Sequence, residues 1–556
     1  MTRTAALLGI LLIGTLAQPA LPQAATITGG VIDSAGRQPL SGAVIQVYGE
    51  GELRGRGLSD AQGEFRIRPS GPVDEFRVVR IGFRPQTQRL AALSAASLRV
   101  EFQMQRIPAF LDPVRVVAAQ CGGRRVRGPS PVALIEQARA GLLATIVSRE
   151  QNPARMVRIL YERHGTNLTG RGGAQHVRLD TATAAIRSFS AVHDAEGFVR
   201  RGFLEEIDGE QVYYAPDAEV LLADEFAAGY CFHVVPRVRD RPNQVGLGFD
   251  AADRRRGRVD VTGVLWIDTL ARELREIEFR YVGLNRYFEQ LRPGGNVAFR
   301  ALPNGMVVID DWSLTLVGMQ TDSVADQGAR GRATTRVILV RSGGVLAEAE
   351  WRDGTRWRAT LPTLEGLARW GDGQPAAGVQ LSLRGTPFAA RTDSAGAFRF
   401  ENIVPGRYEI LAMDEELLAI GLATRTSAIV DVGAAGLSTA PVMVPRRDGE
   451  VAQRCLEAGA QNVNNNSTML LARALHDDGT PVAGAEWNVR VVDHTGWRDA
   501  ATDGLTGGDG VILVCTRLLR GAEFELTVRA AGDLTNVQRG TLTHRATVLG
   551  VVFPRR

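Results

Sequence analysis

The sequence predicts a mainly β protein of several domains, in which small β-sandwiches flank a middle domain of mixed α and β structure. Short runs of Val, Ile, Phe and Tyr alternate with polar residues and end at Gly, Pro, Asp or Ser, as in antiparallel strands joined by tight turns. This pattern occurs three times along the chain, and such repetition sets the architecture. A longer segment with one helix-like stretch lies between the first and second copies.

The first 25 residues are typical of a secretory signal peptide. Arg3 precedes an apolar run over residues 5–16, and small residues follow it up to Ala25. The run is shorter than the roughly 20 apolar residues that a spanning helix needs. We therefore expect an exported protein that is not membrane-spanning after signal cleavage, in the periplasm or at the outer cell surface.

The basic residues indicate the source and exclude some chemistry. All 65 are Arg, which together with abundant Ala and Gly is typical of a GC-rich bacterial genome. Without lysine, a P-loop lysine or a Schiff-base lysine is excluded. The net charge of +4 is small for 556 residues, so we expect no nucleic-acid partner.

The three copies begin near residues 27, 365 and 470, and each carries a Pro-x-x-Gly pair. The pairs are Pro39 and Gly42, Pro375 and Gly378, and Pro481 and Gly484. The first two copies closely resemble the carboxypeptidase regulatory-like domain, a transthyretin-like β-sandwich. The resemblance implies the fold and no chemistry, because this family is an accessory module on many unrelated proteins.

The middle segment opens with a predicted helix over residues 131–149. Pro131 suits the first helical position, and Leu134, Ala138, Leu142 and Ile146 recur at four-residue spacing. Such a helix is expected to cover a sheet. Strands are predicted at residues 156–161, 189–192, 211–214, 219–222, 259–267, 273–281, 313–317 and 335–340, with a hairpin turn at residues 304–305.

Residues 263–281 and 303–312 together resemble LolA/LolB-like lipoprotein carriers. That resemblance implies a half-barrel, a curved antiparallel sheet partly closed by helices over an apolar cavity. The predicted organisation is a signal peptide (1–25), a first sandwich (26–106), an α+β half-barrel-like domain (120–350), a second sandwich (360–446) and a third, divergent sandwich (466–556). Residues 461–467 form a polar linker.

Four cysteines in an exported chain favour disulfides over metal or redox chemistry. Three pairings are possible, and shared domain membership favours Cys121 with Cys231 and Cys455 with Cys515. No C-x-x-C motif is present, which argues against zinc or thioredoxin-like sites.

Catalytic motifs are missing from the sequence. His193 and Glu196 have the spacing of two zinc ligands in carboxypeptidases, but no suitably placed third His follows and the strand–helix alternation of a peptidase is lacking. We therefore predict no catalytic residue, no cofactor and no metal ligand, and we expect that the protein is not an enzyme.

Trp351, Trp357 and Trp370 cluster around the start of the second copy and are candidates for stacking on sugars, with packing between domains as the alternative. We expect a non-enzymatic cell-envelope protein whose sandwiches bind an envelope glycan, lipid or protein. One alternative is a lipid or lipoprotein carrier, which a continuous apolar cavity between the 131–149 helix and the sheet would support. The other is an enzyme with an unrecognised site.

Overall fold

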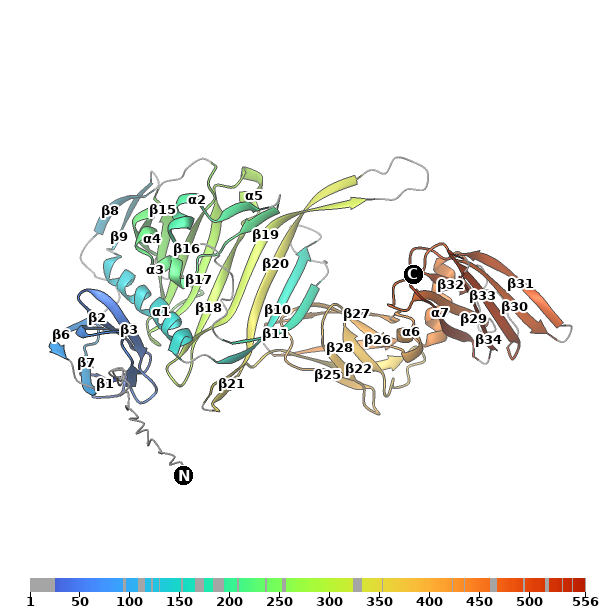
Figure 1. The fold of residues 1–556 in the computed structure, drawn as a ribbon, viewed down its shortest axis with the longest axis horizontal. Coiled ribbons are helices and arrows are strands. Elements are labelled where there is room, and N and C mark those ends of the chain that lie inside the picture. Colours follow the sequence, from blue (N-terminus) through green and yellow to red (C-terminus); the bar gives the residue numbers. More distant parts are fainter. Residues whose placement is uncertain are drawn as a thin grey trace, which may run out of the picture. The chain divides into compact units, whose positions relative to one another are not determined.

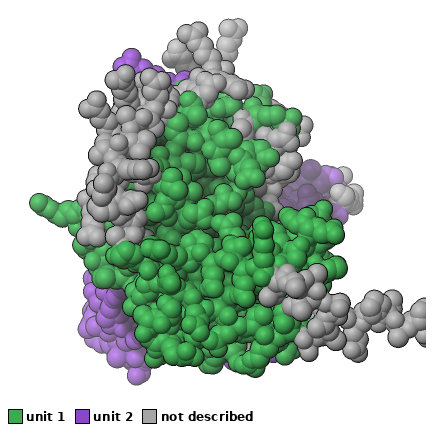
Figure 2. All heavy atoms as spheres, turned by 90° about the vertical axis from the view of Figure 1, so that its left-hand side faces the viewer, with its two compact units in different colours: residues 1–153, 189–284, 296–310 green, residues 154–188, 285–295, 311–556 purple. Residues whose placement is uncertain are grey.

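The predicted fold class is confirmed: the chain is mainly β and multidomain (Figure 1). The computed structural model describes residues 26–93, 97–108, 116–121, 124–129, 131–151, 154–165, 175–183, 195–207, 210–235, 238–252, 257–323, 333–352, 354–422, 424–434, 436–460, 468–493, 496–515, 520–532, 534–542 and 544–555. The predicted signal peptide and the 461–467 linker lie outside them. The chain divides into two compact units, unit 1 (residues 1–153, 189–284 and 296–310) and unit 2 (154–188, 285–295 and 311–556), coloured green and purple in Figure 2.

Unit 1 begins with a sandwich of a three-stranded and a four-stranded sheet. The first sheet has the order β4 (Glu64–Ile67), β1 (Thr26–Asp33), β7 (Ser97–Met104), and the second has the order β3 (Glu52–Leu58), β2 (Val44–Gly49), β5 (Val73–Val79), β6 (Gln86–Leu93). The central strand β1 runs antiparallel to β4 and parallel to β7. Alternate side chains face inward, so Phe76 and Phe102 meet in a buried core with ring centroids 5.6 Å apart.

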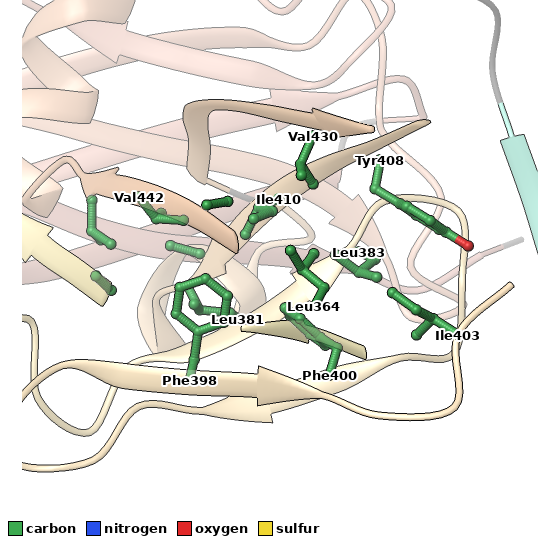
Figure 3. Packing of buried hydrophobic residues seen from close by; sticks show 14 of the residues in the cluster. Leu364, Leu381, Leu383, Phe398, Phe400, Ile403, Tyr408, Ile410, Val430 and Val442 are labelled. Carbon is green, nitrogen blue, oxygen red and sulfur yellow. The ribbon is translucent and has the colours of Figure 1, made fainter. Parts of the chain in front are cut away.

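The two later sandwiches, both in unit 2, repeat this topology. The second pairs β25 (Ala397–Phe400), β22 (Thr363–Trp370), β28 (Leu437–Val444) with β24 (Ala389–Arg391), β23 (Gln380–Leu383), β26 (Gly406–Met413), β27 (Thr424–Val432). The third pairs β32 (Val511–Val514), β29 (Met469–His476), β35 (Ala546–Phe553) with β31 (Gly496–Leu505), β30 (Glu486–Asp493), β33 (Glu523–Ala530), β34 (Leu534–Thr541). Figure 3 shows the second core, where Leu364 and Phe400 from one sheet face Leu381 and Ile410 from the other.

A ten-stranded sheet forms the middle of the chain. Its strands are β10 (Arg155–Gly165), β11 (Gln175–Thr183), β14 (Tyr230–Val235), β15 (Gln244–Ala251), β16 (Asp260–Asp268), β17 (Glu273–Val282), β18 (Gly294–Ala301), β19 (Val307–Ser323), β20 (Ala333–Glu350) and the short β21 (Arg356–Arg358). Their hydrogen-bonded order is β11-β10-β20-β19-β18-β17-β16-β15-β14, with β21 on β20. The described pairings are antiparallel. Two hairpins form separate two-stranded sheets, β8 (Val116–Cys121) with β9 (Arg124–Pro129) and β12 (Leu204–Ile207) with β13 (Glu210–Tyr213).

The predicted long helix is confirmed as α1 (Val132–Gln151). The four residues of its predicted apolar stripe are all at most 5% exposed. Gly141 allows a close approach, because a Cβ there would lie 2.8 Å from Leu274 of β17 and 2.9 Å from Ile81 of the first sandwich. Gln137 also accepts a hydrogen bond from the Gly82 amide at 2.6 Å. Within unit 1, α1 is therefore packed against both the sheet and the first sandwich.

One predicted strand is wrong. Residues 219–222 belong to a short helix, α3 (Ala218–Leu222), because Asp217 caps it by accepting a hydrogen bond from the Val220 amide at 2.9 Å. It is followed by α4 (Asp224–Gly229); the other short helices here are α2 (Ala195–Arg201) and α5 (Arg286–Gln290). The predicted strands at 313–317 and 335–340 are parts of the long β19 and β20, and residues 189–192 lie outside the described chain.

The hairpin turn predicted at Asn304 and Gly305 is present between β18 and β19, with Gly305 at φ +84°. In the parts of the chain that the structure describes, no helix has both the length and the apolar composition needed to cross a bilayer.

Candidate functional site

Two helices join the second and third sandwiches inside unit 2. Helix α6 (Glu415–Ala419) follows β26, and α7 (Arg447–Glu457) follows β28. Their apolar faces meet the three-stranded sheet of the third sandwich in a buried cluster that we call the junction core. It consists of Leu417, Ile420, Val451, Cys455, Met469, Leu471 and Ala546. Shared burial of this kind holds the two sandwiches together.

A disulfide fastens this junction. The predicted Cys455–Cys515 bridge is formed, with a Cα–Cα distance of 5.6 Å, and it ties α7 to the end of β32. Cys231 is also disulfide-bonded. The side chain of its predicted partner, Cys121, lies outside the described residues, so that pairing stays a prediction.

A cleft of about 610 Å³ opens beside the junction core. The second sandwich contributes Trp370 at the end of β22, Arg391 of β24 and the first residues of α6 and α7, and the third contributes the segment before β35. Five arginines line the cleft: Arg391, Arg446, Arg447, Arg520 and Arg545. Three carboxylates line it too: Asp414, Glu415 and Asp448. Its volume lies within the roughly 300–1,000 Å³ of small-ligand sites.

Arg446 is held in a fixed position at the cleft wall. Its guanidinium lies 5.2 Å from the centroid of the Trp370 ring and donates to Asp372 at 2.9 Å. The Gln374 amide and Arg446 hold the pKa of Asp372 below its usual range, so this carboxylate stays charged at neutral pH. Cation–π contact and an ion pair together fix the plane of the guanidinium.

Two further arginines of the cleft form ion pairs with carboxylates of the helix starts. Arg447 Nε donates to both carboxylate oxygens of Asp414 at 3.1 Å, and Asp414 also caps α6 by accepting from the Leu417 amide at 3.2 Å. Arg545 of the third sandwich pairs with Asp448 of α7 at 2.8 Å. These carboxylates are engaged in structure, which leaves Glu415 as an exposed acidic group at the cleft.

Arg391 differs from its neighbours. It is exposed at the cleft, and among the described residues it has no carboxylate within ion-pair distance. Arg391 and Arg446 therefore both offer guanidinium groups to the cleft. The lining can form charge-assisted hydrogen bonds with a carboxylate or phosphate brought in by a ligand.

The three predicted stacking tryptophans have different surroundings. Trp351 is 3% exposed, and its Nε1 is buried without a hydrogen-bond partner, so its ring is not open to a surface ligand. Trp357 lies half-buried on β21. Only Trp370 of the three lines the cleft, and there it packs against the second core and supports Arg446, so it is not a bare stacking surface.

Sequence reasoning missed the arginine cluster because its members lie far apart in the chain. One local signal was available. Residues 447–457 place Asp448 and Glu450 in a first helical turn and Arg454 in the last, as expected for a helix. That helix brings Arg446 and Arg447 to the start of α7.

The described residues contain no group of three His, Cys, Asp or Glu side chains placed to hold a metal ion. His193 of the carboxypeptidase-like pair lies outside them, as does the side chain of Glu196.

Aromatic side chains fill the space between the short helices and the sheet in unit 1. Phe226 of α4 stacks on Tyr230 of β14 at 3.9 Å and lies 5.7 Å from Phe249 of β15. Phe198 of α2 stacks on Phe203 at 5.0 Å. All five rings are at most 6% exposed. The aromatic layer under α2 and α4 is therefore closely packed.

No protein-family model matches the chain, and no curated protein matches its sequence. Three solved structures that match it are the Bacillus anthracis TIE protein (10% identity, 63% of each chain covered, TM-score 0.15), a Streptococcal ancillary pilin (13%, 47% of this chain and 81% of that one, 0.15) and BcpA, the major pilin subunit of Bacillus cereus (8%, 76% and 99%, 0.13). The chain spans slightly less than two thirds of the Bacillus anthracis protein. At these TM-scores, none of the three bears on the function of this chain.

Proposed function

We propose that the protein is a non-enzymatic, exported component of a bacterial cell envelope that binds an acidic glycan in the cleft of unit 2. The observation that carries this proposal is that two guanidiniums line the cleft: Arg391, which has no ion-pair partner among the described residues, and Arg446, which packs on Trp370. The first two sandwiches are, in this proposal, carboxypeptidase regulatory-like modules, supported by the repeat motifs and the shared sheet topology.

The ligand class follows from the chemistry of the lining. Planar guanidinium groups match carboxylates in a two-point geometry and keep their charge at any physiological pH. The exposed Glu415 carboxylate and the Gln380 amide add hydrogen-bonding groups for hydroxyls. A ligand that carries both carboxylates and hydroxyls is a sugar acid, and a chain of such sugars fits a cleft shared by two sandwiches.

Isothermal titration calorimetry of the mature protein with tetragalacturonate, with neutral maltotetraose for comparison, tests the proposal. We expect tetragalacturonate to bind and maltotetraose to bind at least tenfold more weakly. Arg391→Ala and Arg446→Ala should each weaken tetragalacturonate binding about tenfold, the effect of losing one charge-assisted contact of about 1.4 kcal/mol or more.

Arg407→Ala is the matched control. Arg407 is exposed on β26 of the same sandwich, and it is not among the residues that line the cleft. Its removal should leave the affinity unchanged. Equal affinity for both tetrasaccharides, or equal losses in the Arg391 and Arg407 variants, would reject the acidic-glycan site.

A further inference from the structure

A second cavity, of about 320 Å³, lies inside unit 1 between the first sandwich, α1 and the tip of the β16–β17 hairpin. Its apolar lining residues include Ala140, Gly141 and Ala144 of α1, with Leu274 of β17 and Val307 of β19. Ala140, Ala144 and Leu274 are at most 5% exposed. Its polar lining residues are Arg80, Arg272, Glu273 and Ser41.

Arg80 is the unusual group of this cavity. It follows β5 directly and is half-buried. Its Nε is buried without a hydrogen-bond partner, and its Nη1 donates to the Arg272 carbonyl at 3.3 Å. No carboxylate lies within ion-pair distance of Arg80 among the described residues. Burial lowers the pKa of this guanidinium, Glu273 opposes that effect and Arg272 adds to it, but an arginine remains charged in a protein.

Arg272 brings a second guanidinium to the same cavity. It occupies the hairpin turn in the left-handed region, with φ +57°, and its aliphatic stem lies on Gly82, where a Cβ would come within 2.2 Å. Its guanidinium lies 5.7 Å from the Phe83 ring centroid. The described cavity lining contains one carboxylate, Glu273, and this group already pairs with Arg275 at 2.9 Å.

The cavity lining therefore carries two guanidiniums and one carboxylate, and a second carboxylate, Asp33, lies near enough to Arg272 for its pKa to be lowered by it. Arg80 and Arg272 are both half-buried, and withdrawing a charge from water is costly unless a partner group compensates it. The volume lies at the lower end of small-molecule sites and corresponds to about ten water-sized groups of about 30 Å³ each. Ten heavy atoms make a carboxylic acid with a tail of medium length, which is far smaller than the acylated end of a lipoprotein.

We propose that this cavity binds a small aliphatic carboxylic acid, with its carboxylate between Arg80 and Arg272 and its tail along Ala140, Ala144 and Leu274. The site is separate from the cleft of unit 2 and does not depend on the function proposed there.

Calorimetric titration of the mature full-length protein with octanoate tests the site, with octan-1-ol and inorganic phosphate as comparison ligands. Octanoate should bind with one-to-one stoichiometry. The alcohol lacks the charge and phosphate lacks the tail, so each should bind at least tenfold more weakly. Absence of octanoate binding at millimolar concentration, or equal binding of either comparison ligand, overturns the proposal.

Variants locate the site. Arg80→Met keeps the length of the side chain and removes the charge, and it should weaken octanoate binding at least tenfold. Arg84→Met is the matched control, because Arg84 is an exposed arginine four residues away that does not line the cavity. Arg391→Ala in the unit 2 cleft should leave octanoate binding unchanged. Equal octanoate affinity in the two methionine variants contradicts the site. If Arg80→Met does not fold, the comparison of octanoate with octan-1-ol and phosphate on the unchanged protein still tests the proposal.

Discussion

A buried hydroxyl holds the Pro-x-x-Gly turn in each of the three sandwiches. Thr392 Oγ1 donates to the Ala376 carbonyl at 2.6 Å and accepts from the Val379 amide at 2.8 Å. Ser59 and Thr506 make the same two bonds, to the residue after Pro and from the residue after Gly. In every copy the glycine of the turn has φ +70°. The hydroxyl therefore provides hydrogen-bond partners for one backbone carbonyl and one backbone amide that have no partner in a neighbouring strand.

Replacing this hydroxyl should destabilise its sandwich. Thr392→Val keeps the shape of the side chain and leaves a buried carbonyl and a buried amide unpaired, so we expect the free energy of unfolding to fall by about 1–3 kcal/mol. Urea unfolding of the whole protein measures the loss. Thr535→Val, on an exposed position of β34, is the control and should change stability by less than about 0.5 kcal/mol. Equal stability of the two variants would mean that the hydroxyl is dispensable.

Tyr408 makes the core of the second sandwich sensitive to alkaline pH (Figure 3). The side chain is 2% exposed and donates to the Val404 carbonyl at 2.6 Å. Burial raises the pKa of Tyr408 to about 12, against the opposing effects of Gln175 and Arg163. Because the folded pKa lies above the ordinary value of about 10, this hydroxyl stabilises the fold fully below pH 10. The contribution is lost as the pH rises from about 10 through 12.

The variant Tyr408→Phe isolates the contribution of the Tyr408 hydroxyl to the pH dependence of stability. At pH 7 the variant should be less stable than the unchanged protein by about 1–2 kcal/mol, because the Val404 carbonyl loses its partner. Denaturant unfolding at pH 7 and pH 11 should show this gap narrowing at the higher pH, since phenylalanine does not titrate. A gap that stays constant or widens would contradict the assignment.

At the scale of elements, α7 links the two later sandwiches through both packing and a covalent bond. It contributes Val451 and Cys455 to the junction core, both 0% exposed, and its first turn pairs with the third sandwich through Asp448 and Arg545. An internal ion pair between Glu450 and Arg454 at 3.0 Å supports the helix itself. The shape of the cleft depends on this helix, because Arg446, Arg447 and Asp448 all line it.

Removing the disulfide should loosen this link. The bridge closes a loop with a sequence separation of 60. The lower conformational entropy of the cross-linked unfolded chain predicts a stabilisation of about 4 kcal/mol, and engineered disulfides often stabilise by less. The double variant Cys455→Ala and Cys515→Ala should lower the free energy of unfolding by about 2–4 kcal/mol and weaken tetragalacturonate binding. The double variant is preferable to a reducing agent, because reduction would also break the bond of Cys231. Unchanged stability would show that packing alone holds the junction.

At the scale of the whole molecule, short sequence patterns predicted those elements whose structure depends on neighbouring residues in the chain. Alternating apolar residues, the Pro-x-x-Gly pairs and the stripe on α1 predicted the sandwiches and the long helix, because period and turn chemistry act over a few residues. The strand predicted at residues 219–222 was wrong because a four-residue apolar run fits a strand or a helix turn, and the Asp217 cap decided between them.

The cleft of unit 2 and the cavity of unit 1 could not be predicted from such local patterns. The Trp370 prediction led to the cleft, but its contact with Arg446 was not predictable, since Arg446 comes from a later segment of the chain. The cleft and the unit 1 cavity are built from residues that come together only through the tertiary fold, such as Arg80 with Arg272. The Cys455–Cys515 bridge was predictable because its two cysteines fall at the edges of one repeat.

Hydrogen–deuterium exchange of the mature protein, with and without saturating tetragalacturonate, tests the central claim most directly. We predict slower exchange of the backbone amides at residues 412–415, 446–448 and 544–546, which line the cleft, and unchanged exchange in the first sandwich. Protection confined to other segments, or no protection at a concentration that saturates binding, would contradict an acidic-glycan site between the second and third sandwiches.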